Sequence, residues 1–242
     1  MDRALFAAAT GMAAQQQNLD VLSNNLANSE VAGFKESSQT FAVLAAPGAP
    51  GLGTIATGEQ TLFKQGKLEK SNGPFDVAID GPGFFALRDA RGRRAYTRNG
   101  EFARASDGTL RTADGWRLEN AGIPPDALSA RVTEDGVLTV TTSNGAKRLA
   151  QLRIAIFPAP EHLRAAGSTI FTATHDSGPA KMIVPGGDDG PKIRFGMLER
   201  SNVSIIESMM QILAAQRAYE ANAKGVQAAD EMLRIANNLQ RT

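Results

Sequence analysis

The chain has 242 residues, a formal net charge of +1 and no cysteine. The missing cysteines exclude disulfides, thiolate zinc sites and cysteine nucleophiles, and the near-neutral charge gives no field that would favour nucleic acid or an anionic membrane. No apolar run approaches the roughly 20 residues that cross a bilayer. The N-terminal MDRALFAAATGMAA lacks the basic and apolar regions of a cleavable signal. We therefore expect no membrane insertion and, if the protein leaves the cytosol, a route that keeps its N-terminus.

The first expected element is a helix from about residue 3 to about residue 28. Its large apolar residues recur every seven positions, with one further leucine on the same side: Leu5, Met12, Leu19, Leu26 and Leu22. Asp2 is a candidate N-cap, and Gly33 a candidate stop. A seven-residue apolar period predicts a helical partner with the same period.

Residues 45–58 are rich in Gly, Pro and Ala and are predicted to be a linker. Beyond them, short runs typical of strands alternate with Asp-Gly and Asn-Gly turns, which favours antiparallel hairpins. The runs are Asp76–Ile79, Phe84–Leu87, Ala95–Arg98, Thr109–Thr112, Ala130–Thr133, Val137–Thr141, Leu149–Phe157, Thr169–Ala173 and Lys192–Leu198. Trp116 and the pair Phe84-Phe85 are expected in the core of this domain, and residues 176–191 are expected to be a mobile loop.

The last expected element is a long helix over Ser204–Leu239. Ser204 and Glu207 have the spacing of a capping box at its start. A second apolar repeat runs along it, with Met209 beside the line: Ile205, Ile212, Tyr219, Val226 and Leu233. Gly225 lies between alanines four residues away on either side, a flat strip that another backbone can approach closely. At about 1.5 Å per residue this helix runs roughly 50 Å, which is too long for one small core to cover.

These patterns predict an α+β fold, in which long N- and C-terminal helices form a coiled-coil-like layer and the middle is a mainly antiparallel β domain. We expect the N-terminal helix and the segment that follows it at 1–44, a linker or extended loop leading into the β domain at 45–74, the β domain at 75–200 and the C-terminal helix at 201–242. The alternative is that each helix merely packs on a globular core. We predict an assembly interface at Leu5, Met12, Leu19, Leu22, Leu26, Ile205, Met209, Ile212, Tyr219, Gly225, Val226 and Leu233.

The search for catalytic chemistry gives no candidate. His162 and His175 lack metal-ligand spacing and are expected at the surface, and the common nucleophile, phosphate-binding and zinc motifs are missing. The arginine-rich stretch 88–104 is interpreted as a solvated face or a subunit contact. We therefore predict no catalytic, cofactor or metal site and no nucleic-acid binding.

Residues 11–35, GMAAQQQNLDVLSNNLANSEVAGFK, resemble the N-terminal signature of the bacterial flagellar rod and hook family. The signature residues are Asn25, Leu26, Ala27 and Asn28, followed by Gly33 and Phe34. The similarity continues through Asp76-Val-Ala-Ile79, Gly83-Phe-Phe85, Tyr96-Thr-Arg98 and Gly100, and it closes with Ser201-Asn202-Val203 and Gln216-Arg-Ala-Tyr-Glu220. These segments follow the order of the family over nearly the whole chain.

The resemblance implies a structural subunit of the flagellar rod, an axial drive shaft that crosses the periplasm and transmits motor torque to the hook and filament. The same resemblance implies export by the flagellar type III apparatus without cleavage. It also implies a helical homopolymer whose terminal helices pack into an inner tube, with other rod and hook proteins as neighbours. The match resembles distal-rod members most, while the short linker, Met1-Asp2 and Gly196-Met-Leu-Glu199 are similar to proximal-rod members.

Burying a large apolar side chain yields only about 2 kcal/mol, against about 1–2 kcal/mol for ordering each residue's backbone. We therefore expect the termini to fold when they meet other subunits. A proximal-rod or hook-like subunit, a secreted adhesin with the β domain as its recognition unit, and a rod-associated wall hydrolase remain as alternatives.

Overall fold

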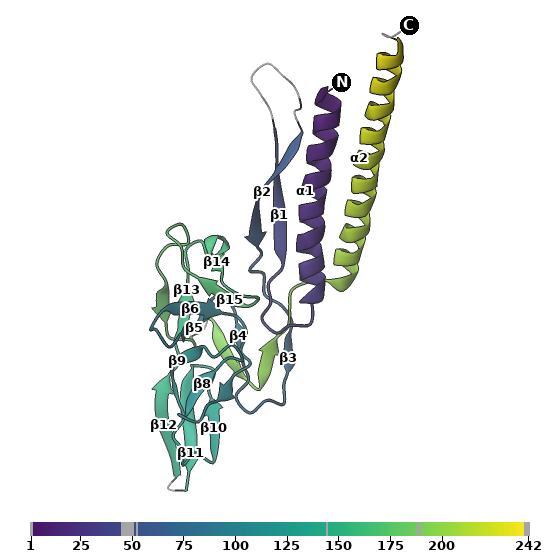
Figure 1. The fold of residues 1–242 in the computed structure, drawn as a ribbon. Coiled ribbons are helices and arrows are strands. Elements are labelled where there is room, and N and C mark those ends of the chain that lie inside the picture. Colours follow the sequence, from purple (N-terminus) through teal and green to yellow (C-terminus); the bar gives the residue numbers. More distant parts are fainter. Residues whose placement is uncertain (1, 45–50, 52, 144, 188–189, 240–242) are drawn as a thin grey trace. The chain divides into compact units, whose positions relative to one another are not determined.

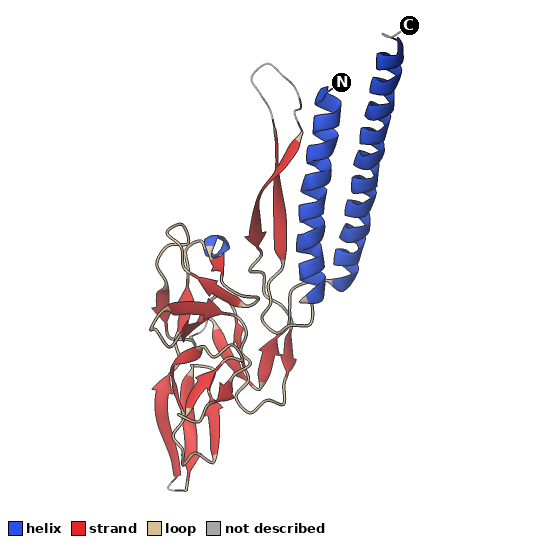
Figure 2. Ribbon diagram, viewed as in Figure 1, coloured by secondary structure: helices blue, strands red, loops and turns tan. Residues whose placement is uncertain are grey.

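The computed structural model describes residues 2–44, 51, 53–143, 145–187 and 190–239, with side chains described for 5–235 of these. The chain forms two compact units. The described residues of Met1–Ala27, Glu36–Leu62 and Val203–Thr242 make up the helical unit, and those of Asn28–Lys35 and Phe63–Asn202 make up the β unit. Both long helices lie in the first unit (Figure 2).

The helical unit contains α1 (Asp2–Ala27) and α2 (Ile205–Leu239), which lie side by side and run in opposite directions (Figure 1). Both helices confirm the prediction to within about two residues. At the start of α2, the Glu207 amide donates to the Ser204 hydroxyl at 3.4 Å, so Ser204 is the N-cap. The proposed cap of α1 lies outside the described side chains.

A hairpin that the sequence did not predict completes this unit. Strand β1 (Ser37–Val43) pairs antiparallel with β2 (Thr54–Thr61), and both lie beside α1 (Figure 1). The linker expected at 45–58 is therefore wrong in its second half, because residues 54–58 belong to β2. Residues 45–50 and 52, in the first half, lie outside the described residues.

The β unit contains all the remaining described strands, and every pair among them is antiparallel. Its largest sheet has the order β14-β15-β6-β5-β9-β8-β7, with β13 joining β5 to β16. These strands are β5 (Phe84–Arg88), β6 (Arg94–Thr97), β7 (Ala103–Arg104), β8 (Thr109–Arg111), β9 (Arg117–Gly122), β13 (Ile154–Ile156), β14 (Arg164–Ala165), β15 (Ile170–Thr172) and β16 (Lys181–Ile183).

Three smaller sheets accompany it. A three-stranded meander consists of β10 (Ser129–Val132), β11 (Val137–Thr142) and β12 (Gly145–Gln151), and two pairs join β4 (Val77–Asp80) to β17 (Lys192–Phe195) and β3 (Leu68–Lys70) to β18 (Met197–Glu199). A short 3₁₀ helix, Pro160–His162, precedes β14. Each of the nine expected runs overlaps at least one strand, and the runs 149–157 and 192–198 each overlap two strands. The loop expected at 176–191 is wrong in part, because residues 181–183 within it form β16, which pairs with β13.

Two apolar clusters hold the β unit together. The larger includes Phe85, Ile79, Leu87 and Leu138, with Trp116 packed at its edge, and the smaller includes Phe84. The expected core position is thus confirmed for Phe84 and Phe85, whereas Trp116 is half-buried against the larger cluster. Phe84 and Phe85 point to different clusters because successive side chains of a strand face opposite sides of the sheet.

Candidate assembly surface

Small and polar side chains of α2 face α1. Ser208, Ala215 and Ala229 are buried, and half-buried Asn222 continues the same seven-residue spacing. A Cβ on Gly11 of α1 would lie 2.9 Å from the Asn222 amide nitrogen. The backbone of Gly11 therefore lies against the Asn222 side chain of the other helix. In the predicted flat strip, Ala229 is buried but Ala221 and Gly225 are exposed.

The predicted α2 seam lies in a different phase of the repeat. Ile205, Met209 and Tyr219 are exposed, whereas Ile212, Val226 and Leu233 are half-buried. Gly225 is exposed, and a Cβ added there would lie 3.8 Å from the Ala8 Cβ. Within the chain, the seam therefore borders the contact with α1 and does not form its centre.

The predicted α1 residues are better covered. Leu22 is buried and the other four, Leu5, Met12, Leu19 and Leu26, are half-buried. The buried residues Ala14 and Asn25 complete this face. Because Leu22 is the only large apolar side chain fully buried among the described residues of the helical unit, the contact between the helices supplies little hydrophobic stabilisation.

A patch of large apolar side chains is exposed at the start of α2. Ile206, Met209, Met210 and Leu213 are 74, 54, 61 and 57% exposed. Their three- and four-residue spacing places them on one helix face, roughly opposite the stripe of Ser208 and Ala215. We call these four residues the α2 patch. A contiguous exposed apolar patch of this kind indicates a protein contact.

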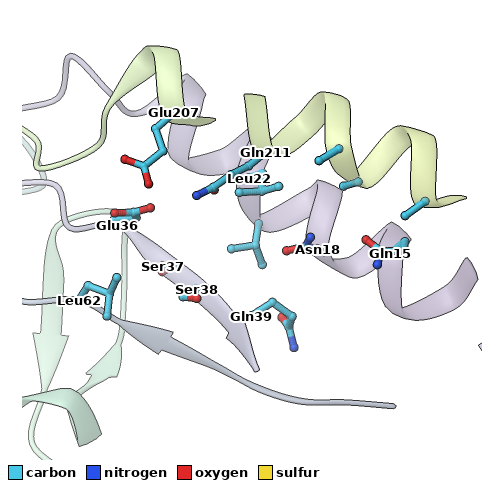
Figure 3. A pocket seen from close by; sticks show the side chains of 14 residues that line it. Gln15, Asn18, Leu22, Glu36, Ser37, Ser38, Gln39, Leu62, Glu207 and Gln211 are labelled. Atoms are coloured by element: carbon cyan, nitrogen blue, oxygen red, sulfur yellow. The ribbon is translucent and has the colours of Figure 1, made fainter. Parts of the chain in front are cut away.

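A groove of about 630 Å³ lies between α1, β1 and α2 (Figure 3). Leu22 and Val21 of α1 contribute apolar surface. Small residues line the walls on either side: Ser37 and Ser38 on β1, and Ala214, Ala215 and Ala218 on α2. Glu36 and Glu207 lie at one end, and Gln15 and Asn18 lie farther along (Figure 3). The lining residues include no lysine or arginine.

Asn25 of the family signature has a clear structural role. Its buried side chain donates to the Ser37 carbonyl at 2.7 Å and accepts from the Ser37 amide at 2.9 Å. This pair of hydrogen bonds resembles one rung of a β ladder and fixes the first residue of β1 to the last turns of α1. Leu26 is half-buried and Ala27 is exposed.

The remaining signature residues lie in the β unit and not in α1. Phe34 is buried, while Asn28, Ser201 and Asn202 are half-buried. Gly33 does not stop α1, which ends six residues earlier at Ala27. It has a φ of +70°, and a Cβ there would lie 2.2 Å from the Asn99 amide nitrogen. Glycine is therefore required by both its backbone conformation and its neighbour.

The sequence prediction missed a buried ionic cluster in the β unit. Glu199 accepts from Lys35 Nζ at 2.5 Å and from Arg98 Nη1 at 3.1 Å. Burial lowers the pKa of Lys35 and of Arg98, and Glu199 opposes both shifts. Arg98 is thus an exception to the solvated face expected for 88–104, although Arg88, Arg91, Arg93 and Arg94 are exposed as predicted. In the sequence, the one feature that Lys35, Arg98 and Glu199 share is that each lies in a segment similar to the flagellar rod and hook family.

The described residues offer no group of histidines, aspartates and glutamates that could hold a metal ion. His162 and His175 are both exposed, as expected. None of the described helices combines the length and the apolar character needed to cross a membrane.

Three family descriptions match successive parts of the chain. "Flagella basal body rod protein" matches residues 5–35, "Flagellar hook protein FlgE/F/G D1 domain" matches 78–140, and "Flagellar basal body rod FlgEFG protein C-terminal" matches 195–239. The first match contains most of α1, the last contains all of α2, and the middle one lies within the β unit.

Curated relatives match over their full length. The flagellar basal-body rod protein FlgG of Borreliella burgdorferi is 40% identical over 100% of both chains. FlgG of Agrobacterium fabrum is 35% identical over 97% of this chain and 98% of its own. The rod protein FlgF of Caulobacter vibrioides is 29% identical over 98% of this chain and 97% of its own. The chain therefore belongs to the flagellar basal-body rod FlgEFG family, a structural and non-enzymatic family, and is a FlgG-like structural subunit of the rod.

Proposed function

We propose that the chain polymerises with copies of itself through the α2 patch, that the helical unit is the module that carries this assembly, and that the assembled rod transmits motor torque. The observation behind the proposal is the exposure of Ile206, Met209, Met210 and Leu213 on a helix whose opposite face buries only small residues. Covering four such side chains would contribute about 6–8 kcal/mol before the cost of association is subtracted.

The groove between α1, β1 and α2 is our candidate for the receiving surface. Its small wall residues leave room for the larger side chains of a neighbouring copy. The patch and the groove are different surfaces of the same unit, so a contact between them is heterologous. A heterologous contact that does not close into a ring produces an open helical polymer. Leu22, a residue of the predicted interface, lines this groove. In this proposal it contributes to assembly by forming part of the surface that receives the neighbouring copy.

The remaining expectations form part of the same proposal. Residues 1–44 and 201–242 serve assembly, and 75–200 form a β domain that stays folded in the monomer. The greater identity to FlgG than to the FlgF relative supports a distal-rod position. Other rod and hook proteins, reached by flagellar type III export, are the further partners that we propose.

Leu213→Asp tests the patch directly. A carboxylate at its centre should abolish sedimentable polymer while leaving the monomer's β unit intact by circular dichroism and thermal unfolding. Gln227→Asp, which adds the same charge at an exposed polar position of α2, should assemble normally. Normal polymer from Leu213→Asp would refute the proposal.

Cysteine cross-linking tests the receiving surface, and the chain has no native cysteine to interfere. A chain with both Leu213→Cys and Ser38→Cys should form a ladder of disulfide-linked multimers when assembled rods are oxidised. Each single variant lacks the second thiol and should yield no ladder. If the double variant assembles but stays monomeric on denaturing gels, the groove is not the receiving surface, although the patch proposal stands.

A further inference from the structure

The chain passes between its two units four times. The boundaries fall after Ala27, Lys35, Leu62 and Asn202, so that only eight residues, Asn28–Lys35, separate the first two passages. A structural subunit that transmits torque must carry it through these four passages. Whether they act as four separate linkers or as one joint decides how stiffly the two units are coupled.

Lys35, Arg98 and Glu199 form a buried cluster beside these passages. The side chains of Lys35 and Glu199 are 0% exposed and that of Arg98 is 4% exposed. The same Glu199 oxygen that binds Lys35 also accepts from the Gly66 amide at 2.9 Å. Arg98 donates to the Gly81 carbonyl at 2.7 Å, whereas its Nε atom has no partner among the described residues. Two cations thus share one carboxylate.

Hydrogen bonds within the β unit connect the chain segments next to the second, third and fourth passages. Lys35, the last residue before the second passage, donates to the Lys64 carbonyl at 2.8 Å, two residues after the third. The same carbonyl accepts from the Asn202 side chain at 3.2 Å, at the fourth passage. Glu199 lies three residues before that passage and holds Lys35 directly.

Three further hydrogen bonds, two between backbone groups and one from the Arg200 side chain, involve the first passage and reinforce the others. The Gly33 amide donates to the Glu199 carbonyl at 2.7 Å, and Arg200 donates to the Glu30 carbonyl at 3.3 Å, three residues after the first passage. Within the helical unit, the Leu62 amide donates to the Glu36 carbonyl at 2.8 Å, which joins the second and third passages from their other side.

We infer that Lys35, Glu199 and Arg98 are positioning residues that clamp the four connecting segments into a single joint. The inference rests on the proposed function, since a joint of this kind matters for a subunit that transmits torque. Four segments bound together resist twisting as one body, whereas unbound segments rotate independently. The clamp also fixes the points from which the chain leaves the β unit toward α1 and α2.

Lys35→Met is the most informative variant. It removes one of two cations from one carboxylate, so Arg98 and Glu199 remain a balanced pair and the β unit should stay folded. It also removes the bonds to Lys64 and Glu199. By hydrogen exchange, amides of 28–34 and 64–67 should open at least about tenfold faster, while amides of β5 and β6 keep wild-type rates. Lys67→Met, at a nearby lysine whose side chain is 80% exposed, is the matched control and should leave the exchange rates of both sets of amides unchanged.

A cellular measurement links the clamp to torque. Cells that carry Lys35→Met should assemble rods but lose swimming speed more steeply than Lys67→Met cells as the viscosity of the medium rises. Glu199→Gln is the second variant and should accelerate exchange in the same segments, with the whole β unit also destabilised.

The outcomes separate this inference from the proposed function. Wild-type exchange of 28–34 in Lys35→Met, or an equal loss of protection in β5 and β6, would overturn the clamp. A wild-type dependence of swimming on viscosity would overturn its role in torque. Assembly through the α2 patch is tested by Leu213→Asp, whose result does not depend on either variant of the clamp.

Discussion

The Lys35 ammonium lies 2.5 Å from the Glu199 carboxylate, and both side chains are 0% exposed although 164 residues separate them in the chain. This contact joins the segment after α1 to the strand that leads to α2. The same carboxylate binds Arg98, so residues from three segments that are far apart in the sequence meet at one buried carboxylate. Removing the carboxylate and removing the lysine therefore have different consequences.

Glu199→Gln should destabilise the β unit by about 3–5 kcal/mol, because it leaves two buried cations without a counter-charge. Urea unfolding followed by tryptophan fluorescence measures this, since Trp116 lies at the edge of the β-unit core. Glu69→Gln removes a carboxylate that binds Arg200 at the surface and should cost less than about 1 kcal/mol. Equal losses in the two variants would contradict the buried cluster.

The stability of the β unit should rise with pH on the alkaline side because of Lys35. Burial lowers the pKa of Lys35 in the folded state below its ordinary value of 10.5. Between the two values the unfolded chain binds more protons, so the free energy of unfolding increases with pH. Below the folded-state pKa the cost of burying the charge is fully present.

Lys35→Met is the comparison for this pH dependence. Its free energy of unfolding should lack the rise attributable to Lys35, so the difference between wild type and variant should change steadily as the pH approaches 10.5. Unfolding curves at a series of pH values measure the difference. A constant difference from neutral pH to 10.5 would mean that the pKa of Lys35 is unshifted.

Asn25→Ala should weaken assembly, because it leaves the buried amide and carbonyl of Ser37 without the Asn25 side chain. A cost of about 2 kcal/mol raises the critical concentration for polymerisation about 30-fold. Asn25→Asp keeps the acceptor but loses the donor and should also be defective. Ser23→Ala, at an exposed position of α1, should assemble like wild type; a wild-type critical concentration for Asn25→Ala would refute the role assigned to this side chain.

Gly33→Ala should destabilise the β unit more than Gly196→Ala. Both glycines have a φ of +70°, so alanine costs about 1 kcal/mol of backbone strain at either position. A Cβ at position 33 would also lie 2.2 Å from the Asn99 backbone nitrogen, whereas position 196 has nothing within 4 Å. Thermal unfolding of the two variants measures the difference, and equal melting temperatures would contradict the close approach of residue 33 to Asn99.

The seven-residue period predicted both helices but not the phase of their contact. Two stripes of α2 repeat every seven residues, one with Ile205 and Ile212 and one with Ser208 and Ala215. Size and hydrophobicity favoured the first stripe as the contact. The second faces α1 with small and polar side chains, and the Asn222 side chain in it packs against the Gly11 backbone. The exposed patch follows from this arrangement and was not predicted as such.

The β1–β2 hairpin and the ionic cluster lacked a signal in the residues themselves. The strands SSQTFAV and TIATGEQT contain many polar residues. Residues 54–58 of the second strand were included in the predicted linker because they continue the Gly- and Pro-rich stretch between the two strands. The burial of Lys35 and Glu199 was not predicted, because a partner 164 residues away in the chain leaves no local pattern. The β domain was easier to predict, since Asp-Gly turns and short β-branched runs are local features.

Hydrogen exchange of α2 in a confirmed monomer and in the assembled polymer tests the central claim most directly. We predict rapid exchange of residues 205–235 in the monomer and strong protection in the polymer, with protection around Leu213 lost in any variant that cannot assemble. The core of the β unit should be equally protected in both states. Protection of α2 in the monomer equal to that in the polymer would contradict the claim that the terminal helices gain their order and bury the α2 patch by assembling with copies of the chain.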